Sequence, residues 1–166
     1  MDELEKFYNK ALRFLSYRPR SEKEIRDKLK GKSSFAKASE GQEKQRLEEI
    51  INLVIQKLKK NNFLNDEEFV RWWIEQRTNF KPRSLKLIKI ELGQKGIDKD
   101  LIDQVIDDLR LTIDDLSSAK KLVEKREKKY KDLPKEEKFQ KVARYLASKG
   151  FSYDIIKEIF KTFANG

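Results

Sequence analysis

The chain has 166 residues, of which 41% are charged, and a formal net charge of +10. It contains neither cysteine nor histidine, which excludes disulfides, thiol nucleophiles, zinc sites of the usual type and catalysis by an imidazole base. A basic balance of this size favours a polyanionic partner, usually nucleic acid, and because no run of about 20 apolar residues occurs we expect no membrane partner.

Apolar residues at helical spacing predict a first helix over residues 3–17. Pro19 ends this helix. Ser21 followed by Glu24 forms a capping box, in which each side chain accepts from an unpaired backbone amide, so a second helix is predicted over residues 21–31. Only two of its residues are apolar, and we expect most of its surface to be solvated.

Residues 32–46 are small, polar and without pattern, and we interpret them as a surface insertion. A third helix is predicted over 47–60. Asn65 is expected to cap the next helix, in which Trp72 and Trp73 lie at core spacing, so we expect at least one of the two to be buried.

The stretch 82–109 contains two short helices in succession. Ser84 caps the first, Gly96 ends it, and Asp98 caps the second. The next repeat is predicted to begin near Ser118. In that repeat Pro134 opens a helix and Ser152 caps a last one that ends at Phe163.

The pattern of 82–109 recurs 63 positions earlier, around Pro19, and 54 positions later, around Gly150. The chain therefore consists of three copies of one helical unit: 1–64 with the insertion, 65–110, and 111–166. Repeats of about fifty residues stand alone poorly, so neighbours should stack. The predicted fold is all-α, with three tandem three-helix repeats, resembling helix-turn-helix units, stacked into one curved, elongated domain.

The charges are unevenly distributed along the chain. The three repeats carry net charges of +6, −1 and +5. Within the middle repeat, residues 81–95 are basic, whereas 98–115 contain seven aspartates. If the repeats stack with a constant rotation, basic side chains at equivalent positions line one side. Such a track would bind phosphates in a salt-dependent way. The candidates for partner or nucleic-acid contact are Arg18, Arg20, Arg26, Arg77, Lys81, Arg83, Lys86, Lys89, Lys138, Lys141, Arg144 and Lys149.

Paired carboxylates are the only candidates for metal binding or acid–base chemistry. They lie at 66–68, 107–108 and 114–115. The first group is explained as a helix start and the second faces away from the apolar side of its helix, so we expect no catalytic site, metal or cofactor. Tyr17 and Phe80, each just before a Pro-Arg-Ser turn, are interpreted as packing at corners.

Three segments in order carry a family resemblance: LSYRPRSEKEIRDKL (15–29), NFLNDEEF (62–69) and ELGQKGI (91–97). With them the chain resembles the RecX family, regulators of the bacterial recombinase RecA, over almost its whole length. The family's recognised positions correspond to Arg18, Ser21, Leu29, Asp66, Phe69, Arg77, Leu92 and Gly96. Of these, we expect Arg18 and Arg77 to have the functional potential.

The resemblance implies a curved all-α protein that is not an enzyme. It implies a cytoplasmic protein of the recombination and SOS-repair system, and we expect this protein to be a monomer. Such a protein lodges in the groove of the RecA filament on single-stranded DNA and inhibits ATP hydrolysis, strand exchange and filament growth. Its own affinity for single-stranded DNA is expected to be weak and independent of sequence. The alternatives are a direct helix-turn-helix-like DNA-binding protein and a protein adaptor whose charge only confers solubility.

Overall fold

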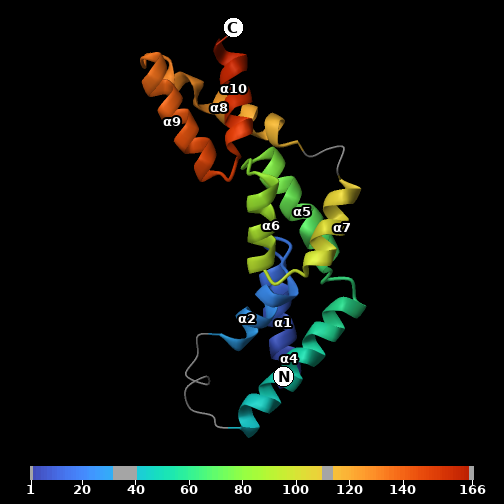
Figure 1. Cartoon of the computed structure of the whole chain (residues 1–166). Coiled ribbons are helices and arrows are strands. Elements are labelled where there is room, and N and C mark those ends of the chain that lie inside the picture. Colours follow the sequence, from blue (N-terminus) through green and yellow to red (C-terminus); the bar gives the residue numbers. More distant parts are fainter. Residues whose placement is uncertain (1, 32–40, 110–113, 165–166) are drawn as a thin grey trace. The chain divides into compact units, whose positions relative to one another are not determined.

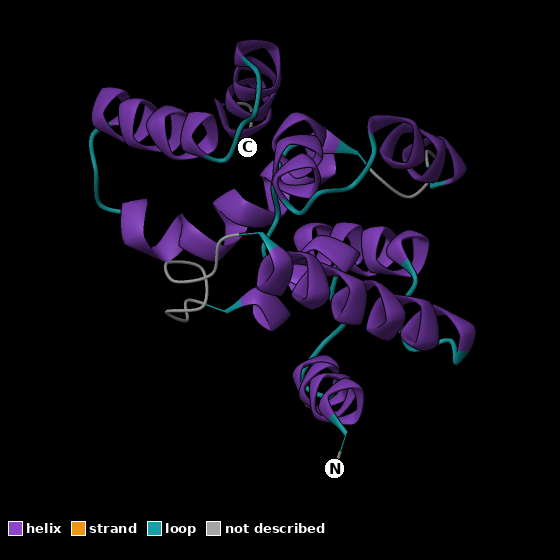
Figure 2. Cartoon of the chain, turned by 90° about the horizontal axis from the view of Figure 1, so that it is seen from below, coloured by secondary structure: helices purple, strands orange, loops and turns teal. Residues whose placement is uncertain are grey.

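A computed structural model describes residues 2–31, 41–109 and 114–164. These residues form helices and no strand (Figures 1 and 2), which confirms the all-α prediction. In chain order the helices are α1 (Glu3–Leu15), α2 (Glu22–Lys30), α4 (Gln42–Lys60), α5 (Asp66–Asn79), α6 (Leu85–Gln94), α7 (Lys99–Asp108), α8 (Asp115–Tyr130), α9 (Lys135–Ser148) and α10 (Tyr153–Ala164).

The contacts divide the chain into two compact units. The first unit contains residues 1–70 together with 94–98, and the second contains 71–93 together with 99–166. The division passes through α5 and near the end of α6 rather than between predicted repeats. The short segment 94–98 therefore belongs with the first repeat, although in sequence it lies in the second.

The core of the first unit lies where α1, α2 and α4 pack together. α2 contributes only Ile25 and Leu29, both almost fully buried, as its thin apolar stripe predicts. α4 contributes the widest apolar face. The buried residues of this core are Tyr8, Ala11, Ile25, Leu29, Ile51, Val54, Ile55, Leu58 and Leu64.

The second unit contains a core formed by α8, α9 and α10. At its edge the rings of Phe139 and Phe160 lie 4.1 Å apart between centroids. Its buried residues are Ala119, Leu122, Val123, Tyr130, Val142, Leu146, Phe151, Ile156 and Ile159. Each three-helix group thus buries one apolar stripe per helix and leaves the charged faces outside.

Two helix starts differ from the prediction by three residues or more. α4 begins at Gln42, so residues 42–46 extend this helix and do not belong to an insertion; the remaining part of the predicted insertion, 32–40, lies outside the described residues. α8 begins at Asp115, because Asp114 caps it by accepting from the amides of Leu116 and Ser117. Ser118, the predicted start, is buried within the helix.

The start of α2 is held by acceptors from a later part of the chain. Ser21 and Glu24 form the predicted capping box. In addition, the Ser21 hydroxyl donates to the Lys95 carbonyl oxygen at 2.7 Å, and the amide of Glu22 donates to Asp66 Oδ1 at 2.8 Å. Ser21 is fully buried in this arrangement. We call it the first junction.

The start of α6 repeats the arrangement within the second unit. The amide of Ser84 donates to the Lys149 carbonyl oxygen at 3.1 Å, and the amide of Leu85 donates to Asp115 Oδ1 at 2.9 Å. Ser84 caps the helix through the amide of Leu87 and is also buried. We call it the second junction. Burial raises the pKa of the carboxyl group of Asp115, and likewise of its counterpart Asp66 in the first junction.

A glycine follows the accepting carbonyl in both junctions. Gly96 and Gly150 have φ values of 77° and 86°, which L-residues with a side chain rarely adopt. A Cβ atom added to Gly96 would lie 2.6 Å from Lys23 Cβ. One added to Gly150 would collide with the Ser84 hydroxyl and with Leu87 Cβ. Both junctions therefore need glycine for backbone conformation and for close approach.

Replacement of Gly150 by alanine is expected to lower the free energy of unfolding by about 1–3 kcal/mol, because it strains a positive φ and displaces the Ser84 cap. Gly93→Ala is the matched control, since Gly93 lies in α6 with open space around it. That control should raise stability by about 0.5–1 kcal/mol. Denaturation followed by circular dichroism measures both, and equal effects of the two substitutions would contradict the junction's role.

Candidate nucleic-acid interface

The predicted basic residues before α2 are engaged with one carboxylate. Arg18 Nη2 lies 2.6 Å from Glu24 Oε1, and Lys95 Nζ lies 2.9 Å from the same oxygen. Arg20 packs on the Phe14 ring, 3.8 Å from its centroid. Burial would raise the pKa of Glu24, yet the hydrogen bonds from Arg18, from Lys95 and from the Ser21 amide hold it below its ordinary value.

Arg26 is also paired within the first unit. Its Nε lies 2.9 Å from Glu22 Oε1 and its Nη1 donates to Asn52 Oδ1 at 2.8 Å. Lys59 reaches the second oxygen of Glu22 at 2.6 Å. The predicted cations Arg18, Arg20 and Arg26 therefore stabilise the start of α2, and their charge is largely compensated.

Glu91 pairs with two arginines of the second unit, Arg77 and Arg83. Arg77 Nε lies 2.9 Å from Glu91 Oε2, and the same oxygen accepts from Trp73 Nε1 at 2.9 Å. Arg77 also lies over the Trp73 ring, 4.4 Å from its centroid. Arg83 Nε is 3.9 Å from Oε1 of the same carboxylate. Burial of Trp73 confirms the expectation that at least one of the two tryptophans packs in the core.

Five of the seven remaining predicted cations fall into two groups; of the other two, Lys149 lies over the Tyr145 ring and Lys138 is also engaged. Lys89 pairs with Asp103 at 2.9 Å, and Lys141 pairs loosely with Glu137 at 3.5 Å, both at exposed positions. A second group consists of exposed side chains for which no carboxylate lies within 4.0 Å among the residues that the structure describes: Lys81, Lys86 and Arg144. We call these three the free cations.

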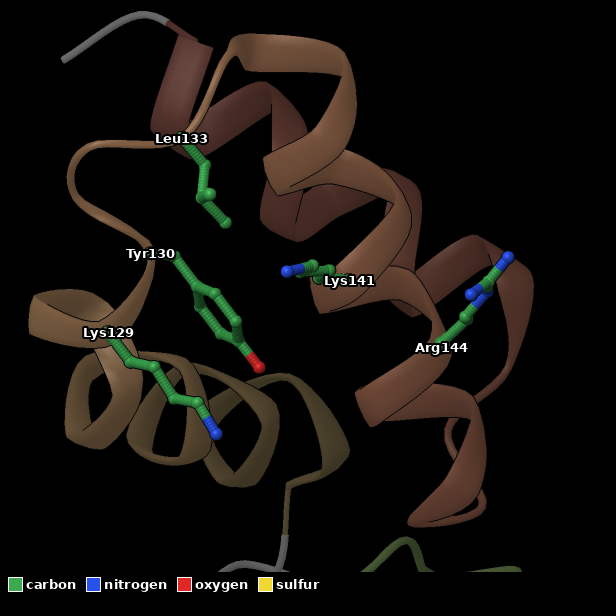
Figure 3. A pocket seen from close by; sticks show the side chains of 5 residues that line it. All are labelled: Lys129, Tyr130, Leu133, Lys141 and Arg144. Atoms are coloured by element: carbon green, nitrogen blue, oxygen red, sulfur yellow. The ribbon is translucent and has the colours of Figure 1, made fainter.

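Two of the predicted residues line a hollow in the second unit. It has a volume of about 340 Å³ and lies between the end of α8 and the outer side of α9 (Figure 3). In Figure 3 the side chains of Leu133 and Lys141 point toward the Tyr130 ring, whereas Arg144 extends away from it. The lining residues are Lys129, Tyr130, Leu133, Lys141 and Arg144. This hollow concentrates positive charge beside one aromatic ring.

The interpretation of Tyr17 and Phe80 as corner packing is wrong. Tyr17 is 77% exposed and Phe80 is 63% exposed. Each follows the last turn of a helix, and the buried residue of its turn is instead the serine four positions later, Ser21 or Ser84. Both aromatic rings are available to a partner.

Three further cations were missed by the sequence reasoning, although they lie on the lysine-rich helix α8: Lys125, Arg126 and Lys129. Arg126 lies over the Tyr145 ring, and Lys125 Nζ donates to the Phe80 carbonyl oxygen at 3.3 Å. Sequence spacing alone gave no signal, because these contacts join different helices. Asp108, predicted to be solvated, pairs with Arg71 at 2.9 Å at an exposed position.

The described residues contain no group of three histidine, cysteine, aspartate or glutamate side chains that would hold a metal ion. Among them, no helix combines the length and the apolar content that a bilayer-spanning segment requires.

All eight positions named by the family resemblance have a structural explanation. Leu29, Phe69 and Leu92 are buried. Ser21, Asp66 and Gly96 form the first junction. The two expected to be functional, Arg18 and Arg77, lie in ion pairs with Glu24 and Glu91 and are mostly buried. Their contact with a partner stays a prediction.

The fold defines a class of protein: a tandem array of three-helix repeats. Comparison with known families identifies the particular one. Models of the first, second and third three-helix domains of RecX match residues 8–33, 65–106 and 113–160. The chain belongs to the RecX family.

Curated relatives have the same name, "Regulatory protein RecX". The protein of Bacillus subtilis is 36% identical over 155 residues, which are 93% of this chain and 54% of that protein. The protein of Clostridium perfringens is 35% identical over 99% of this chain and 71% of its own length. The chain thus spans about half the length of the Bacillus relatives that it matches.

Solved structures agree with the assignment. The crystal structure of RecX from Lactobacillus salivarius matches with a TM-score of 0.69 and 30% sequence identity, and the match covers 98% of this chain and 97% of that one. A second structure, described as regulatory protein RecX, gives the same TM-score at 26% identity.

Replacement of Arg77 by glutamine is expected to lower the free energy of unfolding by about 1–2 kcal/mol, because Glu91 loses its closest cation and Trp73 loses the guanidinium over its ring. Lys86→Gln removes one positive charge from the free cations and should change stability by less than about 0.5 kcal/mol. Urea denaturation measures the free energy of unfolding of both variants, and the difference distinguishes a cation that stabilises the fold from a free cation. Equal stabilities would contradict this division.

Proposed function

We propose that this chain binds the RecA filament on single-stranded DNA and inhibits ATP hydrolysis, strand exchange and filament extension. The observation that carries the proposal is the match of three RecX domains, in order, to most of the chain. The relatives are named regulatory proteins, which supports control of another machine rather than catalysis. On this proposal the protein acts in the cytoplasm as a monomer and needs no cofactor.

The charge distribution supports a partner that presents both phosphate and protein. The free cations carry charge that no described carboxylate compensates. The aspartates of α7, by contrast, give the middle repeat an acidic surface. Complementary charges of both signs favour correct docking on a mixed surface.

The second candidate is direct binding to duplex DNA. It is favoured by the three-helix units, since comparable units place a helix in the major groove, and by Lys81 and Lys86 at the exposed start of α6. A sequence-specific protein of this kind should bind naked duplex at about 10⁻⁸ M or tighter at physiological salt. A filament regulator should bind it weakly and without sequence preference.

The test is the ATP hydrolysis of a bacterial RecA on single-stranded DNA, titrated with this protein below stoichiometry. Wild type should suppress hydrolysis. The variant Lys81→Glu/Lys86→Glu/Arg144→Glu should need at least about ten-fold more protein, because each reversal replaces attraction by repulsion. It changes the net charge by −6. The control Lys10→Glu/Lys44→Glu/Lys60→Glu changes it equally, at exposed positions of the first unit.

Two results would count against the proposal in different ways. If wild type leaves hydrolysis and filament length unchanged, the proposed function is wrong and duplex binding becomes the leading candidate. If wild type inhibits and the free-cation variant inhibits equally, the function stands and the contact lies elsewhere.

A further inference from the structure

Two cations of the second unit lie over the ring of one tyrosine, Tyr145. Arg126 of α8 lies over the Tyr145 ring at 3.8 Å from its centroid, and Lys149, directly after α9, lies 5.5 Å from the same centroid. The neighbouring Tyr130 hydroxyl raises the pKa of Arg126. Tyr130 in turn lines the hollow of Figure 3, so positive side chains continue from Arg126 toward Lys129.

The second junction brings the turn between α5 and α6 to this group. The amide of Ser84 donates to the Lys149 carbonyl oxygen, so Arg83 is adjacent to Lys149. Lys125 Nζ donates to the Phe80 carbonyl oxygen at 3.3 Å. These contacts place the backbone of Phe80, whose side chain is 63% exposed, beside a group of cations. Burial and the positive charges of Arg83 and Arg126 lower the pKa of Lys149.

The positive charge of this group is not balanced by neighbouring carboxylates. Among described side chains, no carboxylate lies within 4.0 Å of the charged nitrogens of Lys125, Arg126 or Lys149. Arg83 shares Glu91 with Arg77 and lies 3.9 Å from it. Like charges held together in this way repel one another, and an external anion relieves the repulsion.

We propose that Phe80, Arg83, Lys125, Arg126 and Lys149, the Phe80 cluster, bind single-stranded nucleic acid: the cations hold successive phosphates and Phe80 stacks on a base. The proposal rests on the proposed function, because it assumes that the target of this chain contains DNA. It deepens that function by assigning the contact to the last two repeats. An exposed ring beside a positive groove is the arrangement that single-strand binders use.

The exposed ring favours a single strand over a duplex. Bases in a duplex are stacked on both faces, whereas an unpaired base offers a free face to Phe80. A purely electrostatic surface for duplex DNA or for an acidic protein does not require an aromatic side chain that is 63% exposed to water. Tyr17, the counterpart in the first unit, provides a matched comparison, because the nearby Arg18 and Arg20 are paired with Glu24.

The experiment is fluorescence anisotropy of a labelled oligo-dT titrated with the full chain, without RecA, at several salt concentrations. Phe80→Leu should weaken binding about 5- to 150-fold, with an unchanged salt slope. Lys125→Gln/Arg126→Gln/Lys149→Gln should reduce the slope of log K against log salt by about 2, that is about 0.7 for each lost phosphate contact. Tyr17→Leu and the control Lys10→Gln/Lys44→Gln/Lys60→Gln should change neither quantity.

Thermal denaturation confirms that each variant is folded before its binding is compared. Unchanged oligo-dT affinity of folded Phe80→Leu, or an unchanged slope for the triple variant, overturns the proposal. Tighter binding to a duplex of equal length than to oligo-dT also overturns it. If the triple variant loses RecA inhibition but keeps its oligo-dT binding, the cluster contacts protein, and the proposal is wrong while the proposed function stands.

The proposal and the proposed function fail separately. Loss of oligo-dT binding in Phe80→Leu and in the triple variant, with wild type inactive on RecA, leaves the nucleic-acid site in place and removes the filament role.

Discussion

The first amides of α2 and α6 have no acceptor within their own helices, as in any α-helix. In this chain they donate to carboxylates from a following part of the sequence, Asp66 for Glu22 and Asp115 for Leu85. Buried serines before them meet the carbonyl oxygens of Lys95 and Lys149. An unsatisfied buried amide costs about 1–3 kcal/mol of stability, so both helix starts depend on these acceptors. Each compact unit contains one such junction, and each junction joins the start of a helix to a later part of the same unit.

The junctions also decide which cations remain available. Arg18 and Arg77 pair with Glu24 and Glu91 and stabilise the fold. The free cations Lys81, Lys86 and Arg144 have no described carboxylate within 4.0 Å. Membership of the RecX family and the division into paired and free cations support one account. In this account some basic residues stabilise the fold, and neighbouring basic residues are proposed to bind a partner.

Much of the fold followed from local sequence. The capping box at Ser21 and the glycine at 96 depend on residues close together in the sequence, so local residue types predict both features. The structure contains both. The use of Asp66 and Asp115 as acceptors for distant amides was not predictable, because it depends on how one repeat meets the next. Residues 42–46 were assigned to an insertion because they lack apolar spacing, yet they extend α4.

The candidate site was less accessible to sequence reasoning. Burial and pairing are tertiary properties, so the sequence does not distinguish the paired Arg77 from the exposed Lys86. The position of Phe80 just before a Pro-Arg-Ser turn favours packing at a corner. Its exposure, and its position beside Lys125, depend on the contact between the turn and α8.

The central claim is that each junction supplies acceptors to the helix-start amides. Amide hydrogen exchange at Glu22 and Leu85 tests it most directly, because first-turn amides exchange rapidly when only water accepts from them. Both amides should be protected in the wild type, and Asp115→Ala should remove protection at Leu85 while leaving Glu22 protected. Rapid exchange of both amides in the wild-type protein would contradict the account.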